Sequence, residues 1–402
     1  MNKETIDYVR PTKRPDALRA ARNLKMTRST QAYVRGSTVK FYEWLGLAGE
    51  RIPEGPAIWI CGDCHHGNIG PVASAEGDIA IEIRDLDQSV IGNPTHDLIR
   101  LGLSLAMSAR DSNLPGVTTA RMLEELMRGY ELALQRAGGS LAGVEKPDAV
   151  KIVMKEALTR SWKQLANDRL GGIKPTIPLG KRFWPLSRTE EKAMAALFLQ
   201  DSWVELQAAL RPEEAGLPIK VIDAAYWMKG CSSLGLLRYA VLIKFQEKDD
   251  GAGKIYLIDI KEAVKTFAPR CTDIKMPRDN AARVVEGARQ LAPYLGKRMV
   301  AARFMDRSVF LRELLPQDMK LDIGQLSREE AMIVARFLGR ILGRAHARQM
   351  DAAIRMSWRR ELLRNHSKTL SAPSWLWSSV VELIGAHERA YLEHCRRFTF
   401  GR

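Results

Sequence analysis

Two short polar stretches contain the residue types that could carry catalysis in this sequence. Residues 61–68 read CGDCHHGN, and residues 84–87 read RDLD. Asp and Asn oxygens are hard ligands that suit Mg²⁺ better than Zn²⁺, whereas a carboxylate that holds no metal can take a proton from an alcohol. We therefore expect Asp63 to act as a base, and Asn68 and Asp85 to bind the metal ion.

Short apolar runs precede both polar stretches, and their pattern predicts strands. Residues 57–61 form the first run, and residues 79–83 form the second, after a turn sequence at residues 76–78. Helical periodicity follows over 95–111 and 118–137. Because polar groups at the ends of neighbouring strands converge, we expect these strands to bring the base and the metal ligands together.

The pattern changes after residue 218. The stretch 12–50 and much of 145–215 read as helices, whereas the next hundred residues alternate like strands around one helix at 279–292. The expected strands are 219–228, 238–246, 255–260, 299–304 and 308–314. Three helical stretches follow Ser327. The sequence thus predicts an α+β fold with a helical region at residues 1–218, a sheet-rich region at 219–318 and a second helical region at 319–402.

The polar stretches resemble the catalytic core of the protein-kinase-like superfamily, especially that of aminoglycoside phosphotransferases. Residues 61–68 match a loop that reads H-G-D-x-H-x-x-N, with Cys61 in place of the first His. Residues 85–87 match the D-x-D core of the metal motif, and residues 92–98 match the G-[DN]-P-x-x-D-L pattern that follows it. The resemblance gives Asp97 a structural role, in which it accepts hydrogen bonds from the backbone of the catalytic loop.

The nucleotide-binding elements of a kinase would come after the catalytic core in this chain. Residues 230–235 (GCSSLG) begin a strand pair, and their small side chains let backbone N–H groups approach phosphates. The resemblance assigns Lys261 to the α and β phosphates and Glu286 to an ion pair with Lys261. The expected nucleotide-binding residues are Gly230, Ser232, Ser233, Gly235, Lys261 and Glu286. This order implies a circularly permuted protein-kinase-like two-lobe fold, with an antiparallel sheet lobe and a larger helical lobe.

The whole layout is similar to the bacterial domain-of-unknown-function family 2252, over most of the chain. The resemblance depends on the motifs above, on Arg35-Gly36, on Arg100-Leu101 and on residues 345–348 (AHAR). Three positions depart from the family pattern. Arg84 and Gln88 flank the metal motif where the family usually has Asn and Glu, and Ser232 stands where it usually has Gly.

These features predict an ATP- and Mg²⁺-dependent phosphotransferase that acts on a hydroxyl of a small molecule. One alternative is a non-catalytic, pseudokinase-like nucleotide-binding module that acts through partners. Another is a nucleic-acid-binding protein. Transfer of a nucleotidyl group instead of a phosphoryl group would need the nucleotide bound in the opposite direction, and it stays open.

Composition narrows the classes of partner. The 402 residues carry a net charge of +15, which favours anionic partners. Arg336, Arg340, Arg344 and Arg348 form an i, i+4 row, which is either a solvated helix face or an anion-binding groove. No apolar run reaches the length of a membrane span. The polar N-terminus and the five cysteines lead us to expect a cytoplasmic protein without a disulfide scaffold.

The segment Cys61-x-x-Cys64-His65 also has the spacing of a c-type haem attachment site, and with His66 it has the residue types of a zinc site. Both are weaker alternatives, because Asp63 and Asn68 fit the catalytic-loop pattern and no second Cys/His pair lies nearby at ligand spacing.

Overall fold

The computed structural model describes residues 9–135, 145–159, 176–210, 216–231, 234–245, 255–271, 273–318, 327–364 and 373–399. Helices and antiparallel sheets make up these ranges, so the predicted α+β class is confirmed. None of the helices in them is long and apolar enough to span a membrane.

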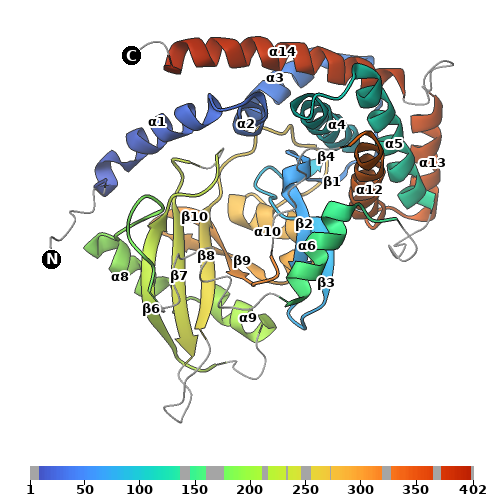
Figure 1. Cartoon of the computed structure of the whole chain (residues 1–402). Helices are drawn as coiled ribbons and strands as arrows, with labels where there is room; N and C mark the ends of the chain where they lie inside the picture. Colours follow the sequence, from blue (N-terminus) through green and yellow to red (C-terminus); the bar gives the residue numbers. More distant parts are fainter. Residues whose placement is uncertain are drawn as a thin grey trace.

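A six-stranded antiparallel sheet forms one side of the molecule (Figure 1). The strand order is β5–β6–β7–β8–β10–β9, and helix α10 (Asn280–Leu291) connects β8 to β9. The strands are β5 (Phe183–Trp184), β6 (Ile219–Trp227), β7 (Arg238–Phe245), β8 (Ile255–Glu262), β9 (Met299–Phe304) and β10 (Arg307–Leu314). The five strands predicted after residue 218 are confirmed. Strand β5 was not predicted, because two residues are too few to show a periodic pattern.

Side chains alternate between the two faces of this sheet. Tyr239 and Val241 of β7 and Ile258 and Ile260 of β8 pack against α8 (Arg188–Leu197) and α9 (Asp201–Leu210) in one apolar cluster. Residues of the opposite parity, Arg238, Asp259 and Lys261 among them, share the other face, because Arg238 lies directly opposite Lys261 in the β7–β8 register. The sheet therefore presents charged residues on the face away from α8 and α9.

Helices from both halves of the chain form the other side of the molecule (Figure 1). Helix α12 packs on α5 so closely that a Cβ at Gly339 would lie 2.1 Å from the Leu126 carbonyl oxygen. Near the chain ends, Tyr391 donates a hydrogen bond to the Thr27 carbonyl. The remaining helices of the described residues are α1 (Arg14–Met26), which packs near α8 at the sheet, α2 (Thr30–Gly36), α3 (Thr38–Ala48), α4 (Pro94–Asp111), α5 (Gly116–Gln135), α6 (Asp148–Thr159), α11 (Pro293–Gly296), α12 (Arg328–Ala347), α13 (Ala352–Arg364) and α14 (Ser374–Thr399).

Two small antiparallel pairs of strands lie between the sheet and the helices (Figure 1). Strand β1 (Ile58–Ile60) pairs with β4 (Val90–Gly92), and β2 (Ile69–Ala73) pairs with β3 (Ile79–Ile83). The predictions of β1 and β3 are confirmed. Strand β2, which contains Gly70 and Pro71, and the three-residue β4 were not predicted. These pairs place residues 61–68 and 84–88 side by side.

Candidate active site

Asp97 fixes the backbone of the first polar stretch. Its Oδ2 accepts a hydrogen bond from the Cys61 N–H at 2.7 Å, and its Oδ1 accepts one from the Gly62 N–H at 2.9 Å. His346 of α12 lies 3.2 Å from the same carboxylate, and Tyr130 lies 2.9 Å from the other ring nitrogen of His346. All of these side chains are buried. The structural role predicted for Asp97 is confirmed.

Gly62 allows the two polar stretches to approach each other. Its φ of +75° lies in the left-handed region, and a Cβ at this position would lie 2.2 Å from the Gln88 carbonyl oxygen. Any other residue would force the two segments apart. The glycine thus sets the short distance between the loop that carries Asp63 and the loop that carries Asp85.

Asp63 is held by three side chains. Arg100 of α4 donates from Nε to Asp63 Oδ1 at 2.7 Å, and Thr38 of α3 donates to Oδ2 at 2.9 Å. Asn68 donates from Nδ2 to the Asp63 carbonyl oxygen at 3.0 Å. Arg100 is only 1% exposed and also donates to the Val34 carbonyl. Asp63 and Asn68 therefore lie together as predicted, but the sequence analysis gave no role to Arg100 or Thr38.

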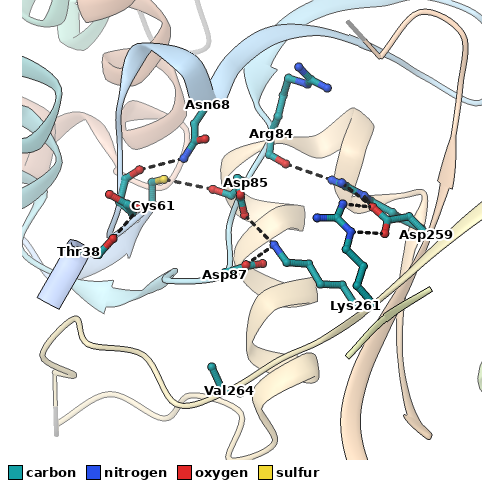
Figure 2. A network of polar contacts seen from close by, with 12 residues as sticks. Thr38, Cys61, Asn68, Arg84, Asp85, Asp87, Asp259, Lys261 and Val264 are labelled. Carbon is teal, nitrogen blue, oxygen red and sulfur yellow. Dashed lines mark hydrogen bonds and ion pairs between the residues drawn. The ribbon is translucent and has the colours of Figure 1, made fainter. Parts of the chain in front are cut away.

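Lys261 reaches across from β8 to the second polar stretch, as Figure 2 shows. Its Nζ lies 3.4 Å from Asp85 Oδ1 and also contacts Asp87 Oδ2. Burial alone would raise the pKa of Asp85, but Lys261 and nearby arginines outweigh burial and hold this pKa below its usual range. Burial, together with the charge of Asp85, raises the pKa of Asp87. Asp87 was not predicted as a site residue, although it belongs to the D-x-D pattern.

The aspartate pair fits a divalent cation. Asp87 Oδ1 is buried and has no hydrogen-bond partner among the described residues, which is costly unless a cation or donor occupies that side. Within the described ranges, no group of three or more His, Cys, Asp and Glu residues could hold a metal ion. Mg²⁺ commonly takes one or two carboxylates and completes its shell with water and substrate phosphates. Asp85 and Asp87, with the neighbouring Asn68, provide such a partial set.

A cluster of charged side chains covers the sheet face next to Lys261. Arg238 donates to both oxygens of Asp259, at 2.9 and 2.6 Å, and Arg312 donates to Oδ2 at 3.0 and 2.8 Å. Arg312 also donates to the Arg84 carbonyl at 3.3 Å, which links the sheet to the second polar stretch (Figure 2). Burial alone would raise the pKa of Asp259. The two arginines have the larger effect, so this pKa lies below its usual range. This cluster was not predicted from the sequence.

Two pockets meet at Asn68 and Asp85. The acidic pocket, of about 190 Å³, is lined by Arg22, Gly36, Thr38, Val39, Asp63, Asn68, Asp85, Asp87, Gln88, Leu234, Leu236, Glu262, Val264 and Phe267. The basic pocket, of about 430 Å³, is lined by Lys25, Ala32, Arg35, Gly67, Asn68, Arg84, Asp85, Lys229, Gly230, Cys231, Arg238, Lys261 and Arg312. Seven of these residues are lysines or arginines, and Asp85 is the one acid among them.

A larger pocket, of about 670 Å³, is lined by residues of α3 and α14, including Trp44 and Trp375. None of the predicted site residues lines it. The size of a pocket therefore does not identify the candidate site in this protein. The residues that could bind a metal and a phosphate line the two smaller pockets.

The predicted pairing of Glu286 with Lys261 is wrong. Glu286 accepts a hydrogen bond from Gln290 at 2.9 Å and lies 3.8 Å from Arg289, both on its own helix α10. Its carboxylate is about one-third exposed. Lys261 instead contacts Asp85 and Asp87, which follow the end of β3 in the chain.

The glycine-rich stretch is described only at some of its positions. Gly230 lines the basic pocket and its carbonyl accepts a hydrogen bond from Lys25 at 2.7 Å. Gly230 and Gly235 have φ values of +100° and +106°, which favour glycine at both positions. Ser232 and Ser233 lie outside the described residues. Their predicted contacts with phosphates stay a prediction.

The cysteines and histidines of the first stretch are packed into the protein. A hydrogen bond with Cys64 and burial raise the pKa of the Cys61 thiol, and burial lowers the pKa of His65 well below its usual value. His66 lies 2.7 Å from Ser104. Zinc and haem sites use thiolates or open imidazoles, so these buried groups fit loop positioning better than the zinc or haem alternative.

Two arginines of the predicted row on α12 contact other helices or loops of the protein. Arg336 forms an ion pair with Glu125 of α5, and Arg348 donates to the Leu291 carbonyl at 2.7 Å. These two arginines therefore stabilise helix packing. Neither a solvated helix face nor an anion-binding groove describes both Arg336 and Arg348.

Comparison with known proteins supports the family resemblance. The family described as "Uncharacterized protein conserved in bacteria (DUF2252)" matches residues 14–397. No curated protein and no solved structure shows a significant match. Because the family match extends over almost the whole chain, from α1 to α14, the protein belongs to the DUF2252 family.

Proposed function

We propose that this protein is an ATP- and Mg²⁺-dependent phosphotransferase that transfers a phosphorus-containing group to a hydroxyl of a small molecule. The observation that carries the proposal is the contact of Lys261 with Asp85, which lies beside Asp63 and Asn68 at the meeting point of two pockets. Protein kinases likewise place a strand lysine on the phosphates of ATP, close to an aspartate that holds Mg²⁺, although their lysine pairs with a glutamate.

The order of elements supports a circularly permuted protein-kinase-like fold. A strand pair β6–β7, the lysine strand β8, helix α10 and the pair β9–β10 follow one another as in the nucleotide-binding lobe of kinases. The segment with Asp63 and Asp85 precedes them in the chain. Helices from both halves of the chain pack around that segment, which joins the two ends of the permuted lobe.

The residues have separate tasks in this proposal. Lys261 would hold donor phosphates, and Asp85, Asp87 and Asn68 would hold the metal ion. When bound, Mg²⁺ supplies charge neutralisation for the phosphates. Asp63 would orient the acceptor hydroxyl and take its proton. The hydrogen bonds from Arg100 and Thr38 leave Asp63 with further lone pairs for this task, because each ionised carboxylate oxygen has about two acceptor sites.

The nearest rival is a non-catalytic nucleotide-binding module. It is favoured by the ion pair between Asp63 and the buried Arg100, since a carboxylate held by an arginine can serve structure alone. A nucleic-acid binder has less support, because seven lysines and arginines gather in one pocket that Asp85 also lines. We place the protein in the cytoplasm, where ATP is the available donor.

Turnover measurements on three variants test the proposal. Asp85→Asn should reduce both Mg²⁺-dependent ATP binding and ATP consumption, because it removes a metal carboxylate. Asp63→Asn should leave ATP binding nearly intact and lower consumption by about 10²–10⁴-fold, the usual contribution of a general base. Asp78→Asn, at the exposed far end of the same β2–β3 pair, is the matched control and should behave like wild type.

The rivals predict other results. A non-catalytic module would bind ATP and show no turnover in wild type or any variant. A nucleic-acid binder would ignore ATP and bind DNA or RNA with a steep salt dependence.

A further inference from the structure

The basic pocket is unsuited to a nucleobase. A base needs apolar or aromatic surface to stack on, whereas the pocket face provided by the sheet consists of Arg238, Lys261 and Arg312. Arg35 of α2 lines the same pocket. A chain of phosphates, with its several negative charges, matches such a surface, because arginines bind phosphate oxygens in pairs of parallel hydrogen bonds.

The buried partner of the arginines strengthens this interpretation. Asp259 holds Arg238 and Arg312 in place through four hydrogen bonds, so their guanidinium groups are pre-oriented. One carboxylate neutralises only one of the two arginines. The pair therefore keeps one net positive charge at the inner end of the pocket, beside Lys261.

The acidic pocket has the opposite character. Apolar side chains line one portion of it, among them Leu234, Leu236, Val264 and Phe267. Its acids are poor neighbours for free phosphates, but its apolar portion suits a nucleoside. Asn68 and Asp85 stand at the boundary of the two pockets, and Asp63 lines the acidic one.

We propose that the nucleotide binds with its β and γ phosphates in the basic pocket and its nucleoside toward the acidic pocket, so that the α phosphorus lies at the boundary and a nucleotidyl group is transferred. This inference rests on the proposed function and specifies which phosphorus reacts. It reverses the direction in which kinases bind ATP, where the γ phosphate faces the catalytic aspartate.

The step balances without any further reactant. The acceptor hydroxyl oxygen attacks the α phosphorus, and its proton passes to the carboxylate of Asp63. The bond between the α phosphorus and the α,β-bridging oxygen breaks. Pyrophosphate leaves with the electron pair of that bond, and the acceptor becomes a nucleotidyl ester.

Product analysis separates the two directions of binding. The full-length protein is incubated with Mg²⁺ and either α- or γ-labelled ATP, with water as the acceptor and in parallel with a metabolite extract. We expect AMP and pyrophosphate from water, and label on an acceptor from α-labelled ATP only. ADP, or acceptor labelled from γ-labelled ATP, would overturn the inference and leave the proposed function standing. No ATP consumption together with no Mg²⁺-dependent ATP binding would overturn both.

Binding of inorganic triphosphate, measured by calorimetry in EDTA, tests the basic pocket without turnover. We expect inorganic triphosphate to bind wild type. Arg35→Gln should weaken this binding at least about tenfold, the effect of losing one hydrogen bond to a charged group. Arg121→Gln, an exposed arginine on α5, is the matched control and should bind like wild type. Equal binding by wild type and Arg35→Gln, or no binding at all, would contradict a phosphate site in this pocket.

Discussion

The ammonium of Lys261 lies 3.4 Å from the carboxylate of Asp85, although the two residues are 176 positions apart in the chain. The lysine is 3% exposed and the Asp85 side chain is 46% exposed, so the contact lies at the wall of a pocket between the sheet and the segment that carries Asp63. A cation at this point keeps Asp85 ionised and offsets the repulsion between Asp85 and Asp87. The sheet is therefore joined to the segment that carries Asp63 through Lys261, the residue that would hold the phosphates.

Replacing this lysine should weaken nucleotide binding. Lys261→Met removes the cation and leaves the two carboxylates facing each other. We expect the ATP dissociation constant in Mg²⁺ to rise at least about tenfold, the effect of losing a hydrogen bond between charged groups. Calorimetric titration measures the change. Circular dichroism, recorded in parallel, verifies that the variant is folded.

Glu286→Gln, unlike Lys261→Met, should leave nucleotide binding almost unchanged. In kinases the corresponding ion pair with the lysine is required, but here Glu286 contacts Gln290 and Arg289 on its own helix. We expect its ATP affinity to stay within about twofold of wild type, because exposed ion pairs contribute about 0–1 kcal/mol. A loss of affinity as large as that of Lys261→Met would show that the lysine changes partner when ATP binds.

Asp97→Ala should destabilise the protein as a whole. The substitution leaves the buried N–H groups of Cys61 and Gly62 without their acceptor, which costs about 1–3 kcal/mol for each unsatisfied group. Urea unfolding should show a loss on the order of 2–5 kcal/mol. Asp111→Asn, an exposed acid at the end of the same helix, is the control and should change stability by less than about 0.5 kcal/mol.

Asp63 and Arg100 should behave as a coupled pair. Removing either partner leaves a buried charge alone, so Asp63→Asn and Arg100→Gln should each destabilise the protein, whereas the double variant should lose less than the sum. We expect a coupling free energy of about 1–3 kcal/mol from urea unfolding. Additive losses would mean that the ion pair does not stabilise the loop.

Stability should fall in mild acid because of His387. Burial lowers the pKa of His387 to about 4, whereas an unfolded histidine titrates near 6.5. Below about pH 6.5 the unfolded chain binds a proton that the folded chain does not, so stability is present above this pH and is lost as the pH falls toward 4. The loss between pH 7 and pH 5 should be on the order of 1–2 kcal/mol.

His387→Asn should reduce this pH dependence, because Asn can still donate to the Leu383 carbonyl but does not titrate. Burial also lowers the pKa of His96 to about 4. Part of the pH dependence of stability should therefore remain in the variant. Urea unfolding of wild type and of His387→Asn at pH 7 and pH 5 measures this pH dependence. An unchanged pH dependence in His387→Asn would exclude His387 as its source.

Much of this architecture is visible in local patterns. The alternation in β7 and β8 and the spacing from Asp63 to Asp85 predicted a sheet and a meeting point of acids, because both depend on near neighbours in the chain. Strand β2 was missed, since Gly70 and Pro71 disfavour strands in general and here the partner β3 overrides them.

Long-range charge pairs gave no such signal. Arg100 meets Asp63, and Arg238 and Arg312 meet Asp259, only after helices and strands have packed. The pairing of Glu286 failed for the same reason, because the choice of partner for Lys261 depends on where β3 ends in space. Sequence alone could place these residues on an element but not select their partners.

Calorimetric titration of wild type with ATP, in Mg²⁺ and in EDTA, determines whether this site binds a Mg²⁺–nucleotide. We expect saturable binding at one site per chain that is clearly tighter in Mg²⁺ than in EDTA. Absence of binding in Mg²⁺, or equal affinity in Mg²⁺ and EDTA, would rule out a Mg²⁺–nucleotide site in this protein.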